Sequence, residues 1–345
     1  MSDGLLGRLL EPAPLTDSEV ASLFSELTNP QTPEVVRAGL LVALESRGAP
    51  VAELAAFARA MRRAAVPFDP PGASDAVDVC GTGGAATPSF NVSTVTAFVV
   101  AGAGQRVIKH GNRSARSPTG SSDLLEALGL GVALSQVEFA RRSFKEYGLA
   151  FLHAPLFHPA TRAVSGVRRV LGIPTVFNRL GPLTNPAGVR YQVTGAASVE
   201  DARRSAEALL ALGGRRGLSV VSEDGADEFS PSRLSHAFVW GSGRLRPTQV
   251  DPGKYLEGDD RRGPWGPLPP PAAAEETIRL LSGGGGARRG AVLLTSGAAL
   301  WVGGAASSLR SGVTEAAEAL DDGRALSLLE DLRTLAAEIP SNGGG

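Results

Sequence analysis

The sequence predicts an α/β protein in which a small α-helical unit precedes a larger unit with a mostly parallel sheet. Helix-start signals and helical spacing of apolar residues occupy residues 1–66, and a Pro/Gly-rich segment follows at 67–72. Short apolar segments then alternate with alanine-rich helical segments. Such alternation is typical of strand–helix–strand units and of a parallel sheet. We therefore expect domains of residues 1–72 and 73–345.

Length, composition and charge agree with this class and exclude others. The chain has 345 residues, of which 43% are hydrophobic and 20% charged, as in a two-domain globular protein. Its net charge of -1 provides no overall field for nucleic acid or for an anionic membrane. The single cysteine, Cys80, excludes an internal disulfide, and no apolar run is long enough to span a bilayer. The absence of a signal-peptide pattern predicts a cytoplasmic protein. The net charge and the lack of a spanning segment predict neither nucleic-acid nor membrane partners.

Three helices are expected before the linker. Thr16 and Glu19 have the spacing of a capping box, and Pro33 after Thr32 marks a second helix start. Gly48 should end that second helix, because glycine readily adopts the left-handed conformation that closes a helix. Apolar residues at helical spacing predict a third helix over 51–64.

The larger unit should contain several buried strands. Apolar runs predict strands over Ala76–Cys80 and Arg106–Lys109, separated by a helical segment at Val95–Ala103. Further expectations are strands over 189–196, 217–222 and 291–294, a helix over 200–212, a loop at 283–286 and an irregular segment over 241–271.

The glycine run Gly81–Gly84 follows a predicted strand and precedes a helix that could begin near Ser93. A backbone without side chains can turn N–H groups towards an anion there. The run also fits the loose dinucleotide pattern, but no Asp or Glu occurs from Val79 through Ser122 to hold a ribose. That stretch instead holds basic residues, namely Arg106, Lys109, His110, Arg113 and Arg116. A multiply charged anionic ligand is favoured over NAD, while a tight turn beside a solvated basic face is the alternative.

Polar side chains at two predicted helix starts and in one acidic loop are further candidates. Segments Asn91–Thr94 and Ser121–Asp123 could cap helices, bind phosphate, or do both. Carboxylates in the loop Ser222–Glu228 suit Mg²⁺, which is held by one or two carboxylates, substrate phosphates and water. An exposed acidic turn is the alternative for that loop.

Eight motifs in order resemble those of the anthranilate phosphoribosyltransferase family and span about residues 78–228. They are Asp78–Gly84, Phe90–Thr94, Lys109–Ser114, Gly120–Leu125, Phe157–Ala160, Val167–Arg169 with Leu171–Ile173, Gly181–Pro186, and Asp224–Glu228. The resemblance implies transfer of phosphoribosyl from phosphoribosyl pyrophosphate (PRPP) to the amine of anthranilate in tryptophan biosynthesis, with release of pyrophosphate. It also implies a homodimer joined through the helical domain, which would take in about residues 165–185.

The same resemblance implies roles for individual residues. Those at its PRPP contacts are Gly81, Gly84, Ala85, Ser89, Asn91, Val92, Ser93, Thr94, Lys109 and Ser121. Those at its Mg²⁺ site are Ser93, Asp227 and Glu228, and those at its anthranilate contacts are Gly81, Asn112 and Arg168. Lys109, His110, Asn112 and Arg168 are then the candidate catalytic residues.

The chemistry of transfer is compatible with these residue types. Lys109 and Mg²⁺ can stabilise the negative charge that develops on leaving pyrophosphate. Arg168 can bind a carboxylate through two hydrogen bonds, and the Asn112 amide can accept one from an amine. His110 is a candidate proton acceptor or, alternatively, a structural donor.

Several positions depart from the family pattern. Ala85 stands where an acid is expected, and Pro174 and Arg179 replace residues expected to be Arg and an aliphatic. Arg116 is an added charge, and Thr295–Gly297 replaces an expected Asn followed by Ala. The alternatives are a related phosphoribosyltransferase or phosphorylase with another acceptor, and a non-catalytic paralogue that binds nucleic acid through its basic loops.

Overall fold

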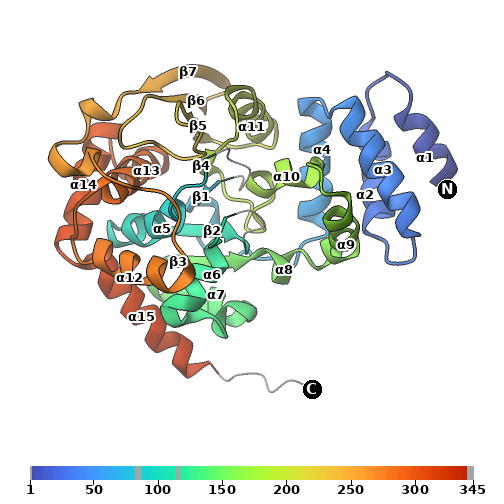
Figure 1. Ribbon diagram of the computed structural model, residues 1–345. Helices are drawn as coiled ribbons and strands as arrows, with labels where there is room; N and C mark the ends of the chain where they lie inside the picture. The colour runs from blue at the N-terminus through green and yellow to red at the C-terminus, as the bar shows by residue number, and fades with distance from the viewer. Residues whose placement is uncertain (1, 82–86, 114–116, 340–345) are drawn as a thin grey trace.

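A bundle of helices stands beside an α/β unit in the computed structural model, which describes residues 2–81, 87–113 and 117–339 (Figure 1). The chain begins with four helices: α1 (Ser2–Leu9), α2 (Asp17–Thr28), α3 (Glu34–Arg47) and α4 (Val51–Arg63). The expected capping box forms, with Thr16 and Glu19 each accepting from the other's backbone N–H. Gly48 ends α3 at a φ of 68°, as its position in the sequence predicts.

In the part of the chain that the structure describes, seven strands form one sheet in the order β3-β2-β1-β4-β5-β6-β7. They are β1 (Val77–Cys80), β2 (Val107–Gly111), β3 (Leu149–His153), β4 (Tyr191–Gly195), β5 (Arg216–Ser222), β6 (Ser235–Gly241) and β7 (Arg244–Val250). The first five in this spatial order are parallel, and β6 and β7 are antiparallel additions. The predicted fold class is therefore confirmed. Parallel order places the carboxyl ends of β1, β2 and β4 at one edge, where ligands bind in such sheets.

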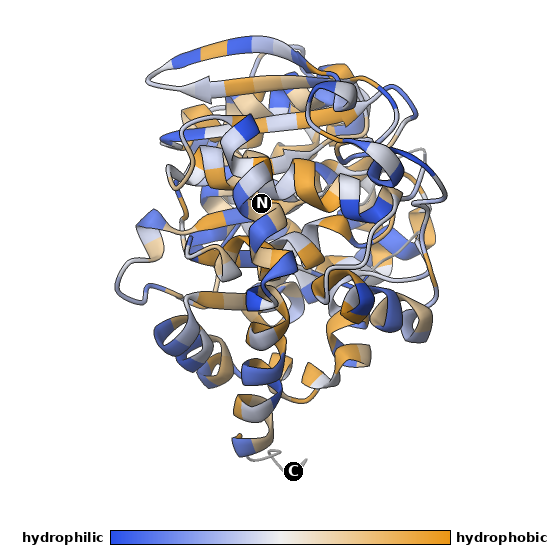
Figure 2. Cartoon of the chain, turned by 90° about the vertical axis from the view of Figure 1, so that its left-hand side faces the viewer, coloured by the Kyte–Doolittle hydropathy of each residue, from blue (hydrophilic) through white to orange (hydrophobic). Residues whose placement is uncertain are grey.

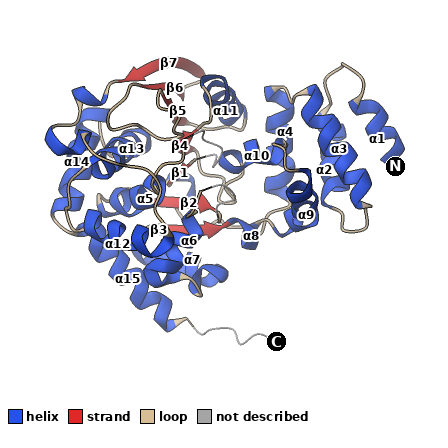
Figure 3. Cartoon of the chain, viewed as in Figure 1, coloured by secondary structure: helices blue, strands red, loops and turns tan. Residues whose placement is uncertain are grey.

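Helices cover both faces of the sheet (Figure 3). The helices that follow the N-terminal bundle in the chain are α5 (Val92–Gly102), α6 (Ser121–Leu125), α7 (Val137–Tyr147), α8 (Ala154–Phe157), α9 (Arg162–Leu171), α10 (Val176–Leu180), α11 (Val199–Ala211), α12 (Pro270–Leu281), α13 (Ala287–Gly303), α14 (Leu309–Asp321) and α15 (Arg324–Glu338), and all but α9 and α10 belong to the α/β unit. Strand β6 shows how the two faces are separated. Ala237 packs into the core that includes α5 and α13, whereas Trp240 packs into the core that includes α4 and α11. Alternating side chains of one strand thus join the sheet to both helical layers.

Two later helices pack with the N-terminal bundle. Val164 and Val167 of α9 and Phe177 of α10 lie in one buried cluster with apolar residues of α2, α3 and α4. Figure 1 shows α10 between this bundle and the sheet, and α9 beside the bundle helices. Because the loops after β2 and β3 lie next to these helices, a cleft between the two units can receive side chains from both.

Some sequence expectations are wrong. Residues 291–294, expected as a strand, lie inside α13, which is buried on nearly all sides. A short apolar run fits a buried helix as well as a buried strand, and only the tertiary position distinguishes them. The segment 241–271, expected to be irregular, contains β7, and strands β3 and β6 were not predicted. Figure 2 shows hydrophilic residues along β7 at the outer edge of the sheet, which weaken its apolar signal.

Within the described ranges, none of the helices combines the length and apolar character that crossing a membrane would require.

Candidate active site

A cleft of about 570 Å³ opens at the carboxyl ends of β1 and β2, next to α9 and α10. It is lined by residues of both units of the chain. Most of the predicted site residues line it, namely Gly81, Ser89, Asn91, Ser93, Lys109, His110, Asn112, Ser121, Arg168, Asp227 and Glu228. Val92 and Thr94 are buried in the first turn of α5 instead. Gly84 and Ala85 lie outside the described residues.

The end of β1 lies against the acidic loop that follows β5. A Cβ atom added at Gly81 would stand 2.7 Å from Oδ2 of Asp227, which is too close for any ordinary contact. At the end of β4, a Cβ at Gly195 would collide with the Asp227 backbone carbonyl. Glycine at both positions therefore lets the two strand ends approach Asp227. Sequence reasoning missed Gly195, which is one of many glycines in this chain.

Lys109 lies on β2 and is only 2% exposed. Its Nζ donates to the Val79 carbonyl at 2.6 Å and to the Ser93 hydroxyl at 3.2 Å. These bonds join β1, β2 and the start of α5, and they hold an ammonium group beside the cleft. Few acceptors and little water compete for such a buried charge, so an anionic ligand would interact with it strongly.

Asp227 and Glu228 are 7% and 6% exposed, so the alternative of an exposed acidic turn is wrong. Burial and the neighbouring Asp227 raise the pKa of Glu228 to about 8, against the opposing effects of Lys109 and of hydrogen bonds from Ser93. Two adjacent buried carboxylates are costly without a cation. Hard oxygen donors from Asp227, Glu228 and Ser93 fit Mg²⁺.

No larger ligand set accompanies this pair. Among the described residues, no group of three or more His, Cys, Asp and Glu side chains could hold a metal. A Mg²⁺ ion at this place would therefore complete its coordination with substrate phosphates and water, as Mg²⁺ commonly does.

Asn91 and Asn112 hold the loops that border the cleft on the side of Lys109, where an anionic ligand is expected. The Asn91 side chain does not cap α5, as one interpretation of the sequence expects, but donates to the Thr119 carbonyl at 3.0 Å. The Asn112 backbone carbonyl accepts from the Ser121 hydroxyl at 3.1 Å. The side-chain oxygen of Asn112 accepts from the Arg113 N–H at 2.7 Å. These bonds hold the starts of α5 and α6 at the same rim of the cleft.

Arg168 presents a guanidinium on the opposite side of the cleft. Its Nε donates to the Thr175 hydroxyl at 3.1 Å, and its Nη2 donates to the Asn178 side-chain oxygen at 3.3 Å. The Phe177 ring lies 5.3 Å from the centre of the guanidinium. Thr175 and Asn178 also form the capping box of α10, so the start of this helix fixes the orientation of Arg168. Sequence reasoning missed both positioning residues, although T-x-x-N before an apolar helix is a recognisable cap signal.

Comparison with known proteins agrees with this geometry. Residues 73–326 match the family described as "Glycosyl transferase family, a/b domain", and residues 4–65 match "Glycosyl transferase family, helical bundle domain". Over 327 residues the chain is 40% identical to an anthranilate phosphoribosyltransferase of Desulfitobacterium hafniense (strain Y51), covering 94% of this chain and 95% of the relative. The chain belongs to the anthranilate phosphoribosyltransferase family.

Solved structures of this family superpose on nearly the whole chain. The anthranilate phosphoribosyltransferase of Thermus thermophilus has a TM-score of 0.88 and 39% identity, covering 96% of this chain and 99% of its own. The enzyme of Saccharomyces cerevisiae in complex with PRPP and Mg has a TM-score of 0.86 and 26% identity, covering 98% of each chain. The family resemblance inferred from the motifs is therefore confirmed, and the chain is a pentosyltransferase.

Departures from the family's motif pattern fall mostly away from the cleft. Arg179 does not line it but forms an ion pair with Glu45 of α3, at 2.5 and 3.0 Å. Pro174 is exposed. Thr295–Gly297 lies in α13, where the lack of a side chain at Gly297 allows close packing against Val313 of α14. Ala85 and Arg116 lie outside the described residues.

Two buried histidines lie beside the cleft. The rings of His110 and His158 are edge to face with centroids 5.0 Å apart. Burial is the main reason that the pKa of His110 falls to about 3 and that of His158 to about 4. Nε2 of His158 lies 3.0 Å from the Thr184 carbonyl, and the Gly181 backbone opposes the fall of the pKa of His110. Both rings are neutral at physiological pH and join β2 to the segment after α10.

Asp78 is a further residue that sequence reasoning assigned no role. It is fully buried in β1, where Oδ1 accepts from the His110 N–H at 3.2 Å and Oδ2 accepts from Gln192 at 3.3 Å. Burial raises the pKa of its carboxyl, while Lys109 opposes that rise. Asp78 therefore anchors the β2 backbone that carries the lysine. A carboxylate inside an apolar strand was the available sequence signal.

Proposed function

We propose that this chain transfers the phosphoribosyl group of PRPP to the amine of anthranilate, in tryptophan biosynthesis. The new bond joins the amine nitrogen to the anomeric carbon, and the bond from that carbon to pyrophosphate breaks. The nucleic-acid-binding alternative and a different acceptor are not favoured, because the relatives that align over most of the chain are anthranilate phosphoribosyltransferases.

One observation carries this proposal: a single cleft holds two binding regions of different chemistry. At one side, two buried carboxylates and buried Lys109 line the cleft together with hydroxyl and amide groups. At the other side, Arg168 is oriented beside an aromatic ring. The first suits a magnesium-bound polyphosphate ester and the second an aromatic carboxylate. The cleft volume of about 570 Å³ is in the range of sites for small organic ligands.

On the donor side, PRPP would lie along the ends of β1 and β2. We assign its contacts to the members of the expected set that line the cleft, namely Gly81, Ser89, Asn91, Ser93, Lys109 and Ser121, together with Gly84 and Ala85, which lie outside the described residues. The side chains of Val92 and Thr94 are buried, so these two residues would instead support the first turn of α5. Ser93, Asp227 and Glu228 would hold Mg²⁺, which stabilises the charge of leaving pyrophosphate. Lys109 lies beside this pair and would stabilise the same developing charge without any change of its own position.

On the acceptor side, Arg168 would bind the anthranilate carboxylate and Asn112 the amine, with Gly81 nearby. Thr175 and Asn178 use Nε and Nη2 of Arg168, and within the described residues no bond to Nη1 is present. The carboxylate would therefore approach the end of the guanidinium that carries Nη1. Holding the anthranilate ring in this orientation would direct its amine towards the donor side. A reactant that is positioned in this way reacts faster.

The structure favours the structural role for His110 over the role of proton acceptor. A group with a pKa of about 3 is a weak base and is rarely protonated at neutral pH. An aromatic amine can attack as the free amine, so the reaction has no need of a strong base at this position. We propose that His110 supports the segment after α10 through its edge-to-face contact with His158, whose Nε2 lies against the Thr184 carbonyl.

Consumption of anthranilate, followed by its fluorescence, tests the proposed function. The mixture contains PRPP and Mg²⁺, and the variants are Arg168→Ala and Asp227→Asn. Wild type should consume anthranilate only with Mg²⁺. Arg168→Ala should raise KM for anthranilate by about 10–100-fold, the worth of hydrogen bonds to a charged group. Asp227→Asn should mainly raise the Mg²⁺ requirement. A folded wild type that consumes no anthranilate at any Mg²⁺ concentration would refute the assignment.

The helical unit would also join two copies of the chain. We assign to it residues 1–72 together with about 165–185, and we propose a homodimer through this surface. Val35 of α3 and Val170 of α9 are 78% and 88% exposed, and Ile173, which follows α9, is 43% exposed. Helices α3 and α9 pack against each other, and exposed aliphatic side chains on neighbouring helices can form an interface. Val170→Asp should convert a dimer to a monomer in sedimentation velocity, whereas a monomeric wild type would exclude the proposal.

A further inference from the structure

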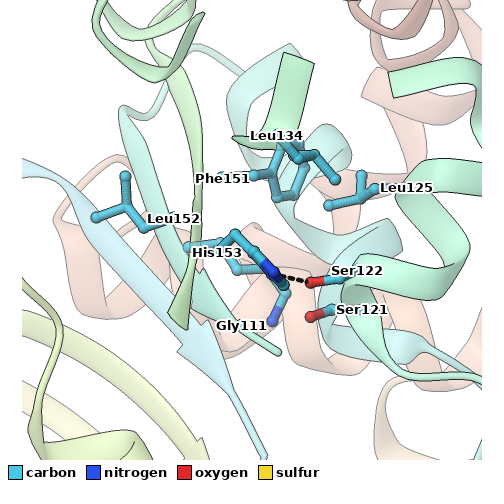
Figure 4. A pocket seen from close by; sticks show the side chains of 9 residues that line it. Gly111, Ser121, Ser122, Leu125, Leu134, Phe151, Leu152 and His153 are labelled. Atoms are coloured by element: carbon cyan, nitrogen blue, oxygen red, sulfur yellow. Dashed lines mark hydrogen bonds between the residues drawn. The ribbon is translucent and has the colours of Figure 1, made fainter. Parts of the chain in front are cut away.

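The end of β3 is joined to the start of α6 by one side-chain hydrogen bond. Nδ1 of His153, the last residue of β3, lies 2.8 Å from the hydroxyl of Ser122 (Figure 4). Ser122 is only 5% exposed, and its neighbour Ser121 lines the large cleft. This bond connects a histidine without an assigned role to the segment that carries a proposed PRPP contact.

Other bonds that hold the start of α6 come from the end of β2. The Asn112 carbonyl accepts from the Ser122 N–H at 3.2 Å and from the Ser121 hydroxyl at 3.1 Å. Gly111 leaves room for Ser121, because a Cβ atom there would collide with its hydroxyl. These contacts fix one side of the segment. The bond to His153 fixes it from the adjacent strand, so that α6 is held from two directions.

Apolar side chains lie behind this bond. A small cavity of about 10 Å³ is lined by Leu125, Leu134 and Phe151 as well as by Ser121, Ser122 and His153 (Figure 4). That space admits about one water molecule. If the bond were lost, Ser122 and the imidazole would find few replacement partners, and a buried polar group without a partner is costly. The start of α6 would then move to relieve the cost.

We propose that His153 is a positioning residue for PRPP: through Ser122 it holds the Ser121 hydroxyl where the cleft receives phosphate groups. The inference rests on the proposed function, because that function assigns Ser121 to PRPP. It goes beyond that function, since neither His153 nor Ser122 belongs to the expected contacts.

The charged neighbours of His153 determine the pH of the test. Burial and Arg113 lower the pKa of His153, and Asp123 and Glu126 of the α6 region oppose this effect. Arg113 is itself paired with both acids, at 2.7 and 2.6 Å. Lys109 lines the same small cavity. At pH 8 the ring is therefore neutral, and replacing it with neutral side chains removes a hydrogen bond and not a charge.

The test measures PRPP binding with Mg²⁺ by calorimetry at pH 8, and KM values for both substrates. His153→Phe keeps an aromatic ring but removes Nδ1, whereas His153→Asn places an amide near the position of Nδ1. Ser122→Ala removes the other partner with a smaller change of volume. His236→Phe, at a partly exposed histidine on β6, is the matched control.

His153→Phe and Ser122→Ala should each weaken PRPP binding about 5–10-fold, which corresponds to the net free energy of one hydrogen bond. The double variant should bind no worse than either single one, because both remove the same bond. His153→Asn should bind like wild type, and KM for anthranilate should change less than about twofold in every variant.

Three results would overturn the proposal. They are unchanged PRPP binding in both single variants, additive effects in the double variant, or equal rises in KM for both substrates, which would indicate general damage. Failure of the proposed function is a separate result, since wild type and His236→Phe would then bind no PRPP. Ser121→Ala reports directly on the assignment of Ser121.

Discussion

Thr175 accepts a hydrogen bond of 3.1 Å from Nε of Arg168, and the same threonine begins α10 as its N-cap. One hydroxyl therefore links the geometry of a helix start to the direction of a guanidinium in the cleft. Thr175 is fully buried, so water cannot replace it as an acceptor. The orientation of Arg168 is built into the fold before any ligand arrives, which reduces the entropy lost on binding.

Thr175→Val should selectively impair anthranilate binding. It keeps the shape of the side chain and removes the acceptor, so we expect KM for anthranilate to rise about 5–10-fold, with KM for PRPP nearly constant. Steady-state kinetics with each substrate varied in turn measures both. Thr96→Val is the control, because Thr96 is equally buried in α5 and its hydroxyl has no partner in the described structure. Equal effects of both variants on both KM values would contradict the role of Thr175.

Gly81→Ala should weaken the use of Mg²⁺. The added methyl would meet the Asp227 carboxylate at 2.7 Å and displace it. Displacement of a metal-binding group commonly costs about 10–100-fold in metal affinity, so half-saturation by Mg²⁺ should shift upwards to that extent. Gly39→Ala on α3 is the control, since nothing lies within 4 Å of the added atom. An unchanged Mg²⁺ titration of Gly81→Ala would show that Asp227 does not serve the metal.

Arg179→Leu should affect stability and not the acceptor. Arg179 pairs with Glu45 across α10 and α3, and both side chains are partly exposed, at 29% and 22%. We expect the free energy of unfolding to fall by about 1 kcal/mol in urea denaturation, the upper value for exposed pairs. KM for anthranilate should stay within about twofold of wild type. Glu45→Leu should give the same loss, and a large change of KM in either variant would place the pair in the acceptor site.

Stability should fall in mild acid because of the two buried histidines. Their pKa values of about 3 and about 4 lie below the ordinary 6.5, so between these values the unfolded chain binds protons that the folded chain does not. The stabilisation is fully present above about pH 6.5 and is lost as the pH falls towards 4. Urea midpoints measured from pH 7.5 to pH 4.5 should show this decline.

His158→Gln should flatten that decline. Glutamine places an amide near the position of Nε2, so it can keep the bond to the Thr184 carbonyl while it removes the titrating ring. The difference in free energy of unfolding between pH 7.5 and pH 4.5 should shrink by roughly 2 kcal/mol. A variant with the same slope as wild type would show that His158 titrates normally in the folded chain.

Much of the site could be predicted because its residues lie in local patterns. The strand, glycine run and helix start around Gly81 and Ser93 are contiguous, and so is the acidic loop with Asp227 and Glu228. Each pattern constrains the backbone within a few residues, which sequence spacing records directly. Segment 291–294 and strand β7 were misjudged for the opposite reason. A buried helix and a buried strand have similar short apolar runs, and an edge strand carries polar residues, so only their neighbours decide between the possibilities.

The sequence alone determined the class of fold, the family and the residue types of an anion site, because local backbone geometry and motif order need few distant contacts. Only the tertiary structure decided which groups meet. It placed Thr175 on Arg168, Glu45 on Arg179 and His153 on Ser122, and it buried Asp227 and Glu228 together. Hydrogen-bond partners and pKa shifts depend on burial and on short distances between segments far apart in the chain. Neither the partners nor the pKa shifts are set until the elements that carry these residues pack against each other.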